Sequence, residues 1–184
     1  MMRVTAGKAK GRRLKSPPMG TRPMTDRIKE SLFSALGDLD GTTVLDLYAG
    51  SGSLGLEALS RGAKKALFVE KERDAIVKLE ENIKATQFGR KSNVEWSDVN
   101  HFLSRGAEKR VDLIFLDPPY THSVAAVRTD LEALVLGGFL ADAGRIVVHR
   151  PQKESQLKPL GLKLVWEREY GQARILVFSH EDED

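Results

Sequence analysis

The sequence contains no cysteine. This absence excludes disulfides, zinc–thiolate sites, iron–sulfur clusters and a thiolate nucleophile. No apolar run approaches the roughly 20 residues that a helix needs to cross a bilayer, and the N-terminus lacks the apolar stretch of a signal peptide. The four histidines (His101, His122, His149 and His180) are scattered, without the spacing of metal ligands. We therefore expect a cytoplasmic protein with no membrane contact and no metal site.

Acidic residues are almost absent from the start of the chain. Among residues 1–29 nine side chains are basic and only Asp26 is acidic, whereas the chain ends in the acidic run Glu181–Asp184. Such asymmetry favours a polyanionic partner for the basic end. Two alternatives are a basic tail that is merely solvated and a transit peptide, although its glycines and prolines would break the helix that a transit peptide needs. The candidate contact residues are Arg3, Lys8, Lys10, Arg12, Arg13, Lys15, Arg22 and Arg27.

Hydrophobic periodicity predicts an α/β fold in one main domain. A helix capped by Thr25 and stopped by Gly37 comes first, and strands then alternate with helices. We predict strands over Thr43–Tyr48, Ala66–Glu70, Asn93–Trp96, Val111–Leu116 and Arg145–His149, and helices over Leu54–Arg61, Glu72–Thr86, Asn100–Ser104 and Val124–Leu136. The last two strands, Leu162–Glu167 and Arg174–Phe178, are joined by a short turn at Gly171, which predicts an antiparallel hairpin.

This alternation predicts a mostly parallel sheet with helices on both faces, closed by the antiparallel hairpin. The one break in composition lies near residue 24. It divides the chain into a basic arm, residues 1–24, and an α/β body, residues 25–184. A chain of 184 residues with 41% hydrophobic and 30% charged side chains is long enough for one such domain.

The first chemical motif is a glycine-rich turn, Gly50-Ser51-Gly52 followed by Gly55, which comes after a strand and opens a helix. It fits G-x-G-x-x-G, and Glu70 follows Gly50 at the spacing of a ribose-binding carboxylate. A dinucleotide cofactor and a purely structural turn are therefore both open. Asp46 favours S-adenosylmethionine, because its carboxylate would repel a pyrophosphate but attract an ammonium and a sulfonium. Asp98, after the third strand, could accept a hydrogen bond from adenine.

The second motif is Asp117-Pro118-Pro119-Tyr120, placed after an apolar strand where open α/β folds bind substrates. The Asp117 carboxylate and the Pro118 carbonyl are two neighbouring acceptors, which suit an exocyclic amine and can receive its proton. Tyr120 offers a ring on which a base can stack. The alternative is a proline turn with a core tyrosine. Methylation at a pyrimidine C5 usually needs a thiolate, so the absence of cysteine favours an exocyclic nitrogen.

These motifs, in this order, resemble class I S-adenosylmethionine-dependent methyltransferases. The whole chain resembles the bacterial 16S ribosomal RNA guanine-N2 methyltransferase family of the RsmD type. The resemblance is carried by RVTAGK at 3–8, GRRL at 11–14, RPMTDR at 22–27, DLYAGSGSLGLEALSR at 46–61, VE at 69–70, DPPY at 117–120 and YGQ at 170–172.

The resemblance implies a seven-stranded Rossmann-like sheet, a monomer, and a base in the small ribosomal subunit as substrate. Asp117, Pro118, Pro119 and Tyr120 would hold the guanine amine and the flipped base. The donor would be held by Thr25, Asp46, Tyr48, Ala49, Gly50, Ser51, Gly52, Glu70, Lys71, Asp98 and Val99, with residues 23–27 closing over its methionine end. The basic arm would be an RNA-binding hairpin.

The chain departs from the family pattern at one place. Where relatives commonly have a carboxylate after the fifth strand, this chain has His149-Arg150-Pro151, so no substrate-binding role is carried over to that position. Three other functions stay open: an adenine-N6 methyltransferase acting on DNA or RNA, a dinucleotide-dependent oxidoreductase, and an RNA-binding module on an inactive methyltransferase fold.

Overall fold

A seven-stranded sheet forms the centre of the protein in a computed structural model that describes residues 2–16 and 23–182. The strand order is β5-β4-β3-β6-β7-β9-β8, parallel from β5 to β7, with β9 antiparallel to both of its neighbours. This arrangement confirms the predicted parallel sheet and its closing hairpin. The strands are β3 (Thr43–Leu47), β4 (Lys65–Glu70), β5 (Ser92–Trp96), β6 (Val111–Leu116), β7 (Leu140–Pro151), β8 (Leu162–Tyr170) and β9 (Ala173–His180).

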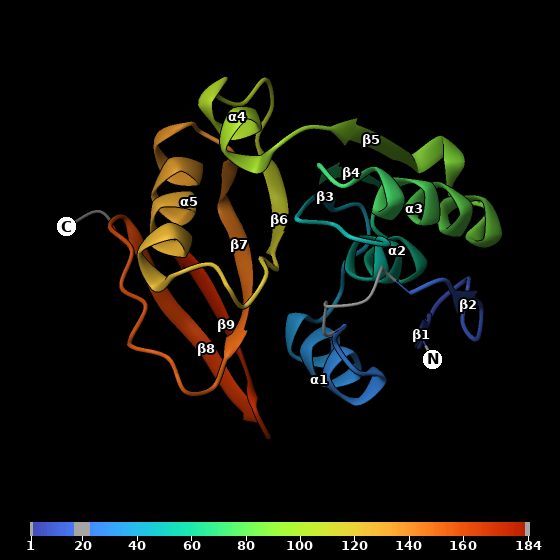
Figure 1. Cartoon of the computed structure of the whole chain (residues 1–184), viewed down its shortest axis with the longest axis horizontal. Helices are drawn as coiled ribbons and strands as arrows, with labels where there is room; N and C mark the ends of the chain where they lie inside the picture. Colours follow the sequence, from blue (N-terminus) through green and yellow to red (C-terminus); the bar gives the residue numbers. More distant parts are fainter. Residues whose placement is uncertain (1, 17–22, 183–184) are drawn as a thin grey trace.

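Helices cover both faces of this sheet (Figure 1). One face carries α1 (Asp26–Leu36), α2 (Ser53–Ser60) and α3 (Arg73–Thr86), and the other carries α4 (Val99–Ser104) and α5 (Val124–Leu136). A short 3-10 turn, η1 (Gly89–Lys91), precedes β5. In the described part of the chain, no helix combines the length and the apolar character that a membrane crossing demands.

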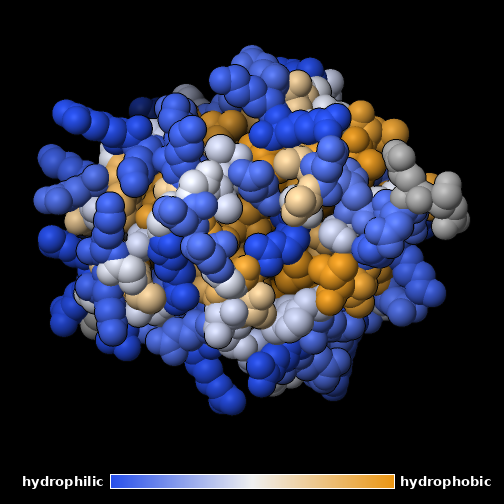
Figure 2. All heavy atoms as spheres, turned by 180° about the vertical axis from the view of Figure 1, so that it is seen from behind, coloured by the Kyte–Doolittle hydropathy of each residue, from blue (hydrophilic) through white to orange (hydrophobic). Residues whose placement is uncertain are grey.

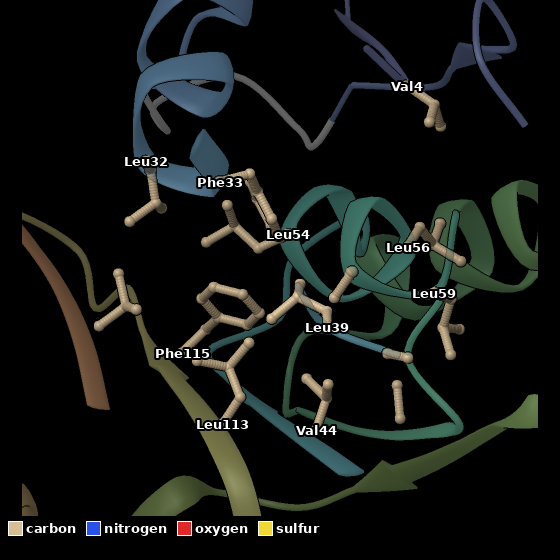
Figure 3. Close-up of a cluster of buried hydrophobic side chains, with 14 of the residues drawn as sticks. Val4, Leu32, Phe33, Leu39, Val44, Leu54, Leu56, Leu59, Leu113 and Phe115 are labelled. Atoms are coloured by element: carbon tan, nitrogen blue, oxygen red, sulfur yellow. The ribbon is translucent and has the colours of Figure 1, made fainter. Parts of the chain in front are cut away.

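Alternating side chains divide the core into two clusters, one on each face of the sheet. On β6, Leu113 and Phe115 pack under α1 and α2, whereas Ile114 and Leu116 pack under α4 and α5. Figure 3 shows the first cluster, where Phe115 meets Phe33 of α1 and Leu54 of α2. Because successive residues of a strand point to opposite faces, a continuous apolar strand is buried on both sides. The near-continuous apolar runs of the sequence reflect this double burial.

The helix starts follow local hydrogen bonding. The Thr25 hydroxyl accepts from the Ile28 amide to begin α1, Asp98 caps α4, and Ser123 caps α5 in the same way. Gly37 ends α1, as predicted.

The edges of several elements differ from the sequence prediction. Tyr48 lies outside β3, because its φ of 56° breaks the extended conformation. Strand β7 begins at Leu140, five residues before the predicted start, and the hairpin strands extend to Tyr170 and from Ala173. Charged and small residues in these stretches hid their strand character, because they lie where the sheet is irregular or exposed.

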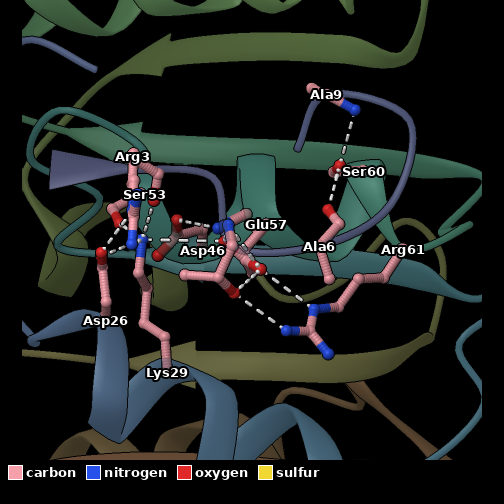
Figure 4. Close-up of polar contacts among 12 residues, drawn as sticks. Arg3, Ala6, Ala9, Asp26, Lys29, Asp46, Ser53, Glu57, Ser60 and Arg61 are labelled. Carbon is pink, nitrogen blue, oxygen red and sulfur yellow. Dashed lines mark hydrogen bonds and ion pairs between the residues drawn. The ribbon is translucent and has the colours of Figure 1, made fainter. Parts of the chain in front are cut away.

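The basic N-terminal segment is folded onto the body. Its strands β1 (Met2–Arg3) and β2 (Arg13–Leu14) pair antiparallel into a two-stranded ribbon, defined here as residues 2–14. Met2, Val4 and Leu14 belong to the same core cluster as α1 and α2. The ribbon is also hydrogen-bonded to α2, since the Ala9 amide donates to the Ser60 hydroxyl (Figure 4). These residues are therefore not a free tail, whereas RNA contact by their exposed basic side chains stays a prediction.

Candidate active site

A cleft of about 960 Å³ opens at the carboxyl ends of β3, β4 and β6. The chain leaves β3 toward β4 on one side, while β6 lies on its other side, so the strand order reverses between β3 and β6. Such a switch point is where open α/β sheets bind ligands. The loops after these three strands form most of the wall, and residues of β1, the end of β7 and the segment before α1 also contribute to it.

The glycine-rich turn forms one wall of the cleft. Gly52 adopts a φ of 86° at the start of α2, and a side chain there would lie 2.3 Å from Leu79. Only glycine fits both the left-handed backbone and this close approach. Before the turn, the Tyr48 hydroxyl donates to Asp130 at 2.6 Å, which anchors the end of β3 to α5. The turn is therefore held rigidly from both sides.

Glu70 ends β4 and organises the loops around the cleft. One carboxylate oxygen accepts from the Gly50 amide at 2.7 Å, and the other accepts from the Lys71 and Glu72 amides at 2.9 Å each. Three backbone donors fix this carboxylate between the glycine-rich turn and the next loop. Glu70 thereby links two of the segments that line the cleft.

Asp46 lies beneath the glycine-rich turn, with only 1% of the residue exposed. The Gly55 amide donates to its carboxylate at 3.0 Å. Burial raises the pKa of Asp46 well above its usual value, and the nearby carboxylates of Asp117 and Glu70 act in the same direction. A cation in the cleft would favour the ionised form of Asp46, because it would offset both effects.

Asp117 and Tyr120 leave the end of β6 and meet a histidine from β7. The Asp117 carboxylate lies 2.9 Å from His149 Nδ1, and the Tyr120 hydroxyl lies 3.0 Å from His149 Nε2. His149 itself is buried. The two side chains that the sequence singled out are thus connected through a third.

Arg150 fastens the loop that follows. Its side chain is fully buried and donates to the carbonyl oxygens of Pro119 and His122, at 3.3 and 2.6 Å. Glu154 pairs with the same guanidinium through both carboxylate oxygens. The backbone of Pro119 is therefore held by a hydrogen bond in addition to the restraint of its ring.

The structure gathers most of the predicted site residues around this cleft. Twelve of them line it: Asp46, Tyr48, Ala49, Gly50, Ser51, Glu70, Lys71, Val99, Asp117, Pro118, Pro119 and Tyr120. Three others do not reach the wall. Thr25 and Asp98 cap helices, and Gly52 lies buried behind the turn. Pro23 and Met24, next to Thr25, do line the cleft. A direct donor contact by any of these residues stays a prediction.

The predicted nucleic-acid contacts lie on the exposed side of the ribbon and at α1. Lys8, Lys10, Arg12, Arg13 and Arg27 are exposed, as are Arg3 and Lys15. The last two pair with acidic side chains, Arg3 with Asp26 and Lys15 with Glu81. Arg22 lies outside the described residues. Seen from behind in Figure 2, hydrophilic side chains crowd the end of the molecule that carries the ribbon and α3.

Sequence reasoning missed the part that β7 plays in the site. A signal was present, because Asp117 and His149 each follow the apolar run of a parallel strand, and β6 and β7 are neighbours with Leu116 beside Val148. Asp117 and His149 are 32 positions apart in the sequence, so their contact could be predicted only once β6 and β7 were known to be neighbours. No local pattern indicated that Arg150 would be buried.

Comparison with known proteins places these features in a family. The sequence model described as Conserved hypothetical protein 95 matches residues 2–179. Ribosomal RNA small subunit methyltransferase D of Escherichia coli K12 is 34% identical over 149 residues, 80% of this chain and 73% of the relative. The protein of that name from Haemophilus influenzae is 31% identical over 176 residues, 92% and 89% of the two chains. The solved structure of yhhF from Escherichia coli, provisionally named a methyltransferase, has a TM-score of 0.86 at 30% identity and covers 99% of both chains.

Proposed function

This chain belongs to the family described as Conserved hypothetical protein 95, and we propose that it transfers a methyl group from S-adenosylmethionine to the N2 amine of a guanine in small-subunit ribosomal RNA. The observation that carries the proposal is the position of Asp117 beside the glycine-rich turn in one cleft. The names of the relatives supply the ribosomal RNA. The guanine amine is our inference from the acceptors and from the family resemblance.

The charge of the cleft supports a cationic donor over a dinucleotide. Five carboxylate residues line it (Asp46, Glu70, Glu72, Asp74 and Asp117), against two lysines, Lys71 and Lys153. A pyrophosphate would be repelled by this wall, whereas an ammonium and a sulfonium would be attracted. The residues present therefore fit S-adenosylmethionine. When bound, that cofactor supplies an electrophilic methyl group on a positively charged sulfur.

Different residues of the cleft would bind different parts of the donor. Glu70 would hold ribose hydroxyls, and its bonds to the Gly50, Lys71 and Glu72 amides support this role by fixing both loops around it. Asp46 lies near enough to Asp117 and Glu70 for their charges to interact, so it can offset positive charge at the centre of the cleft. Pro23 and Met24 limit solvent access on one side.

Asp117 carries the chemistry on the substrate side. The lone pair of the target nitrogen would take the methyl group that the bound donor supplies, and the donor would keep the electron pair of the bond it gives up. The nitrogen then loses a proton. Asp117 is placed to accept a hydrogen bond from the amine before the transfer and that proton after it. Correct alignment of the reacting groups supplies most of the rate.

The proposal is tested with purified small subunits or their ribosomal RNA and with the variant Asp117→Ala. We expect methyl transfer to fall by about 10²- to 10⁴-fold, because the acceptor of the amine proton is lost. RNA binding should be retained, since Asp117 is not one of the basic side chains that we expect to contact phosphates. The matched control is Asp142→Ala, which removes an exposed carboxylate that pairs with Arg110 on the surface.

The methylated base is then identified by mass spectrometry. Label on guanine N2 supports the proposal, and label on adenine N6 would replace it with the alternative amine. Calorimetry decides the donor: binding of NADH with none of S-adenosylmethionine would refute the proposed function. Turnover that is unchanged in Asp117→Ala would refute the role of that residue.

A further inference from the structure

His149 lies near the carboxyl end of β7, beside the end of the neighbouring strand β6. Leu116 of β6 is in register with Val148 of β7, so Asp117 and His149 follow side by side at the same edge of the sheet. The His149 side chain is 4% exposed and does not line the cleft. Its two ring nitrogens lie 2.9 Å from the Asp117 carboxylate and 3.0 Å from the Tyr120 hydroxyl.

We propose that His149 is a positioning residue of the methyl-transfer site, which holds the Asp117 carboxylate and the Tyr120 ring in one hydrogen-bonded array. This inference rests on the proposed function and goes beyond it, because the family resemblance offers no role for a histidine at this position. Asp117 and Tyr120 are the groups placed to meet the target base. His149 acts on the base only through them.

The chemistry of the partners fixes the tautomer of the neutral ring. An ionised carboxylate only accepts hydrogen bonds, so Nδ1 of His149 must carry a hydrogen toward Asp117. Nε2 is then an acceptor, and the Tyr120 hydroxyl donates to it. The edge of one ring faces the other, with 5.5 Å between centroids, so the tyrosine is held by packing as well. His149 thus fixes the orientation of both the Asp117 carboxylate and the Tyr120 ring.

Protonation of His149 would change both bonds. Nε2 would then donate, the Tyr120 hydroxyl would have to accept, and the positive ring would weaken Asp117 as an acceptor for the amine. A cation this close also opposes the positive charge that develops on the target nitrogen. The neutral form of His149 is therefore the active one.

The surroundings of His149 determine the pH at which it becomes protonated. Burial lowers the pKa of His149, but the charge and the hydrogen bond of Asp117 outweigh burial, so the pKa is raised above its usual value. Arg150, on the same strand, opposes the increase, and the facing residue of β9 is the apolar Ile175. Tyr120 completes the contacts of the ring. Activity should accordingly fall with decreasing pH from above the ordinary histidine value of about 6.5.

The test compares the pH dependence of kcat in the wild type, His149→Asn and His149→Leu. In the wild type we expect kcat to fall about tenfold per pH unit below the pKa of His149. Asparagine can donate one bond to Asp117 but cannot titrate, so His149→Asn should have a lower kcat without that acid limb. His149→Leu should lose about 10- to 100-fold in kcat, because both bonds are gone. KM for S-adenosylmethionine should change little in either variant.

One control variant, one double variant and one NMR measurement distinguish a positioning role of His149 from a purely structural one. His101→Asn changes an exposed histidine on α4 and should keep the wild-type pH profile. Tyr120→Phe removes the hydroxyl bond to His149, so combining it with His149→Asn should cost less than the sum of the two single changes. Nitrogen NMR of the ligand-free wild type should show Nδ1 of His149 protonated at high pH.

A persisting acid limb in His149→Asn, or an Nδ1 without hydrogen, would overturn the inference. If His149→Leu does not fold, the asparagine profile and the NMR measurement still decide. A wild type without any methyl transfer would instead refute the proposed function, and the NMR result would then stand by itself.

Discussion

At the scale of single residues, the least expected feature is a lysine buried in the interior. Lys29 is fully buried, and its ammonium donates to the Arg3 carbonyl at 2.6 Å and to the Ser53 hydroxyl at 3.1 Å. The Glu57 carboxylate, also fully buried, lies 3.6 Å away (Figure 4). Burial lowers the pKa of Lys29, and the charge of Glu57 opposes that decrease. The ion pair thus joins α1, α2 and the ribbon at one point.

Lys29→Met should lower the free energy of unfolding by about 3 kcal/mol. The reason is that Glu57 would remain buried with one cation fewer, although Arg61 would still pair with it at 3.0 Å. The matched control is Lys163→Met, which breaks the exposed pair with Asp182 and should cost less than about 1 kcal/mol. Urea denaturation of the two variants measures both values. Equal losses would mean that the buried pair adds nothing special.

At the scale of elements, the ribbon is seated on α2 by a close backbone approach. Gly7 has a φ of 82°, and a Cβ at this position would lie 1.8 Å from the Ser60 carbonyl oxygen. The Lys8 amide donates to that same oxygen at 2.8 Å. Nothing larger than glycine can therefore occupy position 7 while the ribbon stays in place.

Gly7→Ala should release the ribbon from α2. Gly11→Ala is a matched control, because Gly11 has nearly the same φ, 83°, but open space around its Cβ position. The control carries only the cost of a left-handed alanine, about 1–2 kcal/mol, whereas Gly7→Ala adds a backbone clash. Hydrogen exchange at the Thr5, Lys8 and Ala9 amides measures the release. If both variants protect these amides equally, the close approach does not hold the ribbon.

At the scale of the whole molecule, charge separates the basic ribbon from the acidic cleft. The ribbon presents Lys8, Lys10, Arg12 and Arg13 to solvent, whereas carboxylates outnumber lysines five to two among the charged side chains of the cleft. We predict that the ribbon contacts phosphates of the RNA while the cleft holds the cationic donor. The positive charge of the ribbon would then attract the RNA, and the negative charge of the cleft would attract the donor.

Replacing both Arg12 and Arg13 by serine should weaken RNA binding and lower the slope of log affinity against log salt by about 1.5–2. Each phosphate contact releases counterions, so losing two contacts lowers the slope in proportion. The control is Lys109→Ser with Lys158→Ser, two exposed lysines in the loops before β6 and β8. Binding measured at several salt concentrations checks the slope. An identical slope in the two double variants would contradict RNA contact by the ribbon.

The sequence predicted the architecture better than the connections within it. Apolar runs such as Val111–Leu116 identified the buried strands, and the turn residues at Gly50–Gly52 located the cleft. Both signals are local. The contacts of His149, Arg150 and Lys29 were not predicted, because each depends on which strands and helices become neighbours. Long-range pairing of this kind leaves no periodicity in the chain.

Met2 belongs both to the ribbon and to the wall of the cleft. If the ribbon contacts RNA and moves when it does so, the space that would hold the donor changes shape with it. Binding at the two places is then thermodynamically linked, and whatever factor RNA exerts on donor affinity, the donor must exert on RNA affinity. Under the proposed function, RNA and the donor would thus influence each other through the strand that carries Met2.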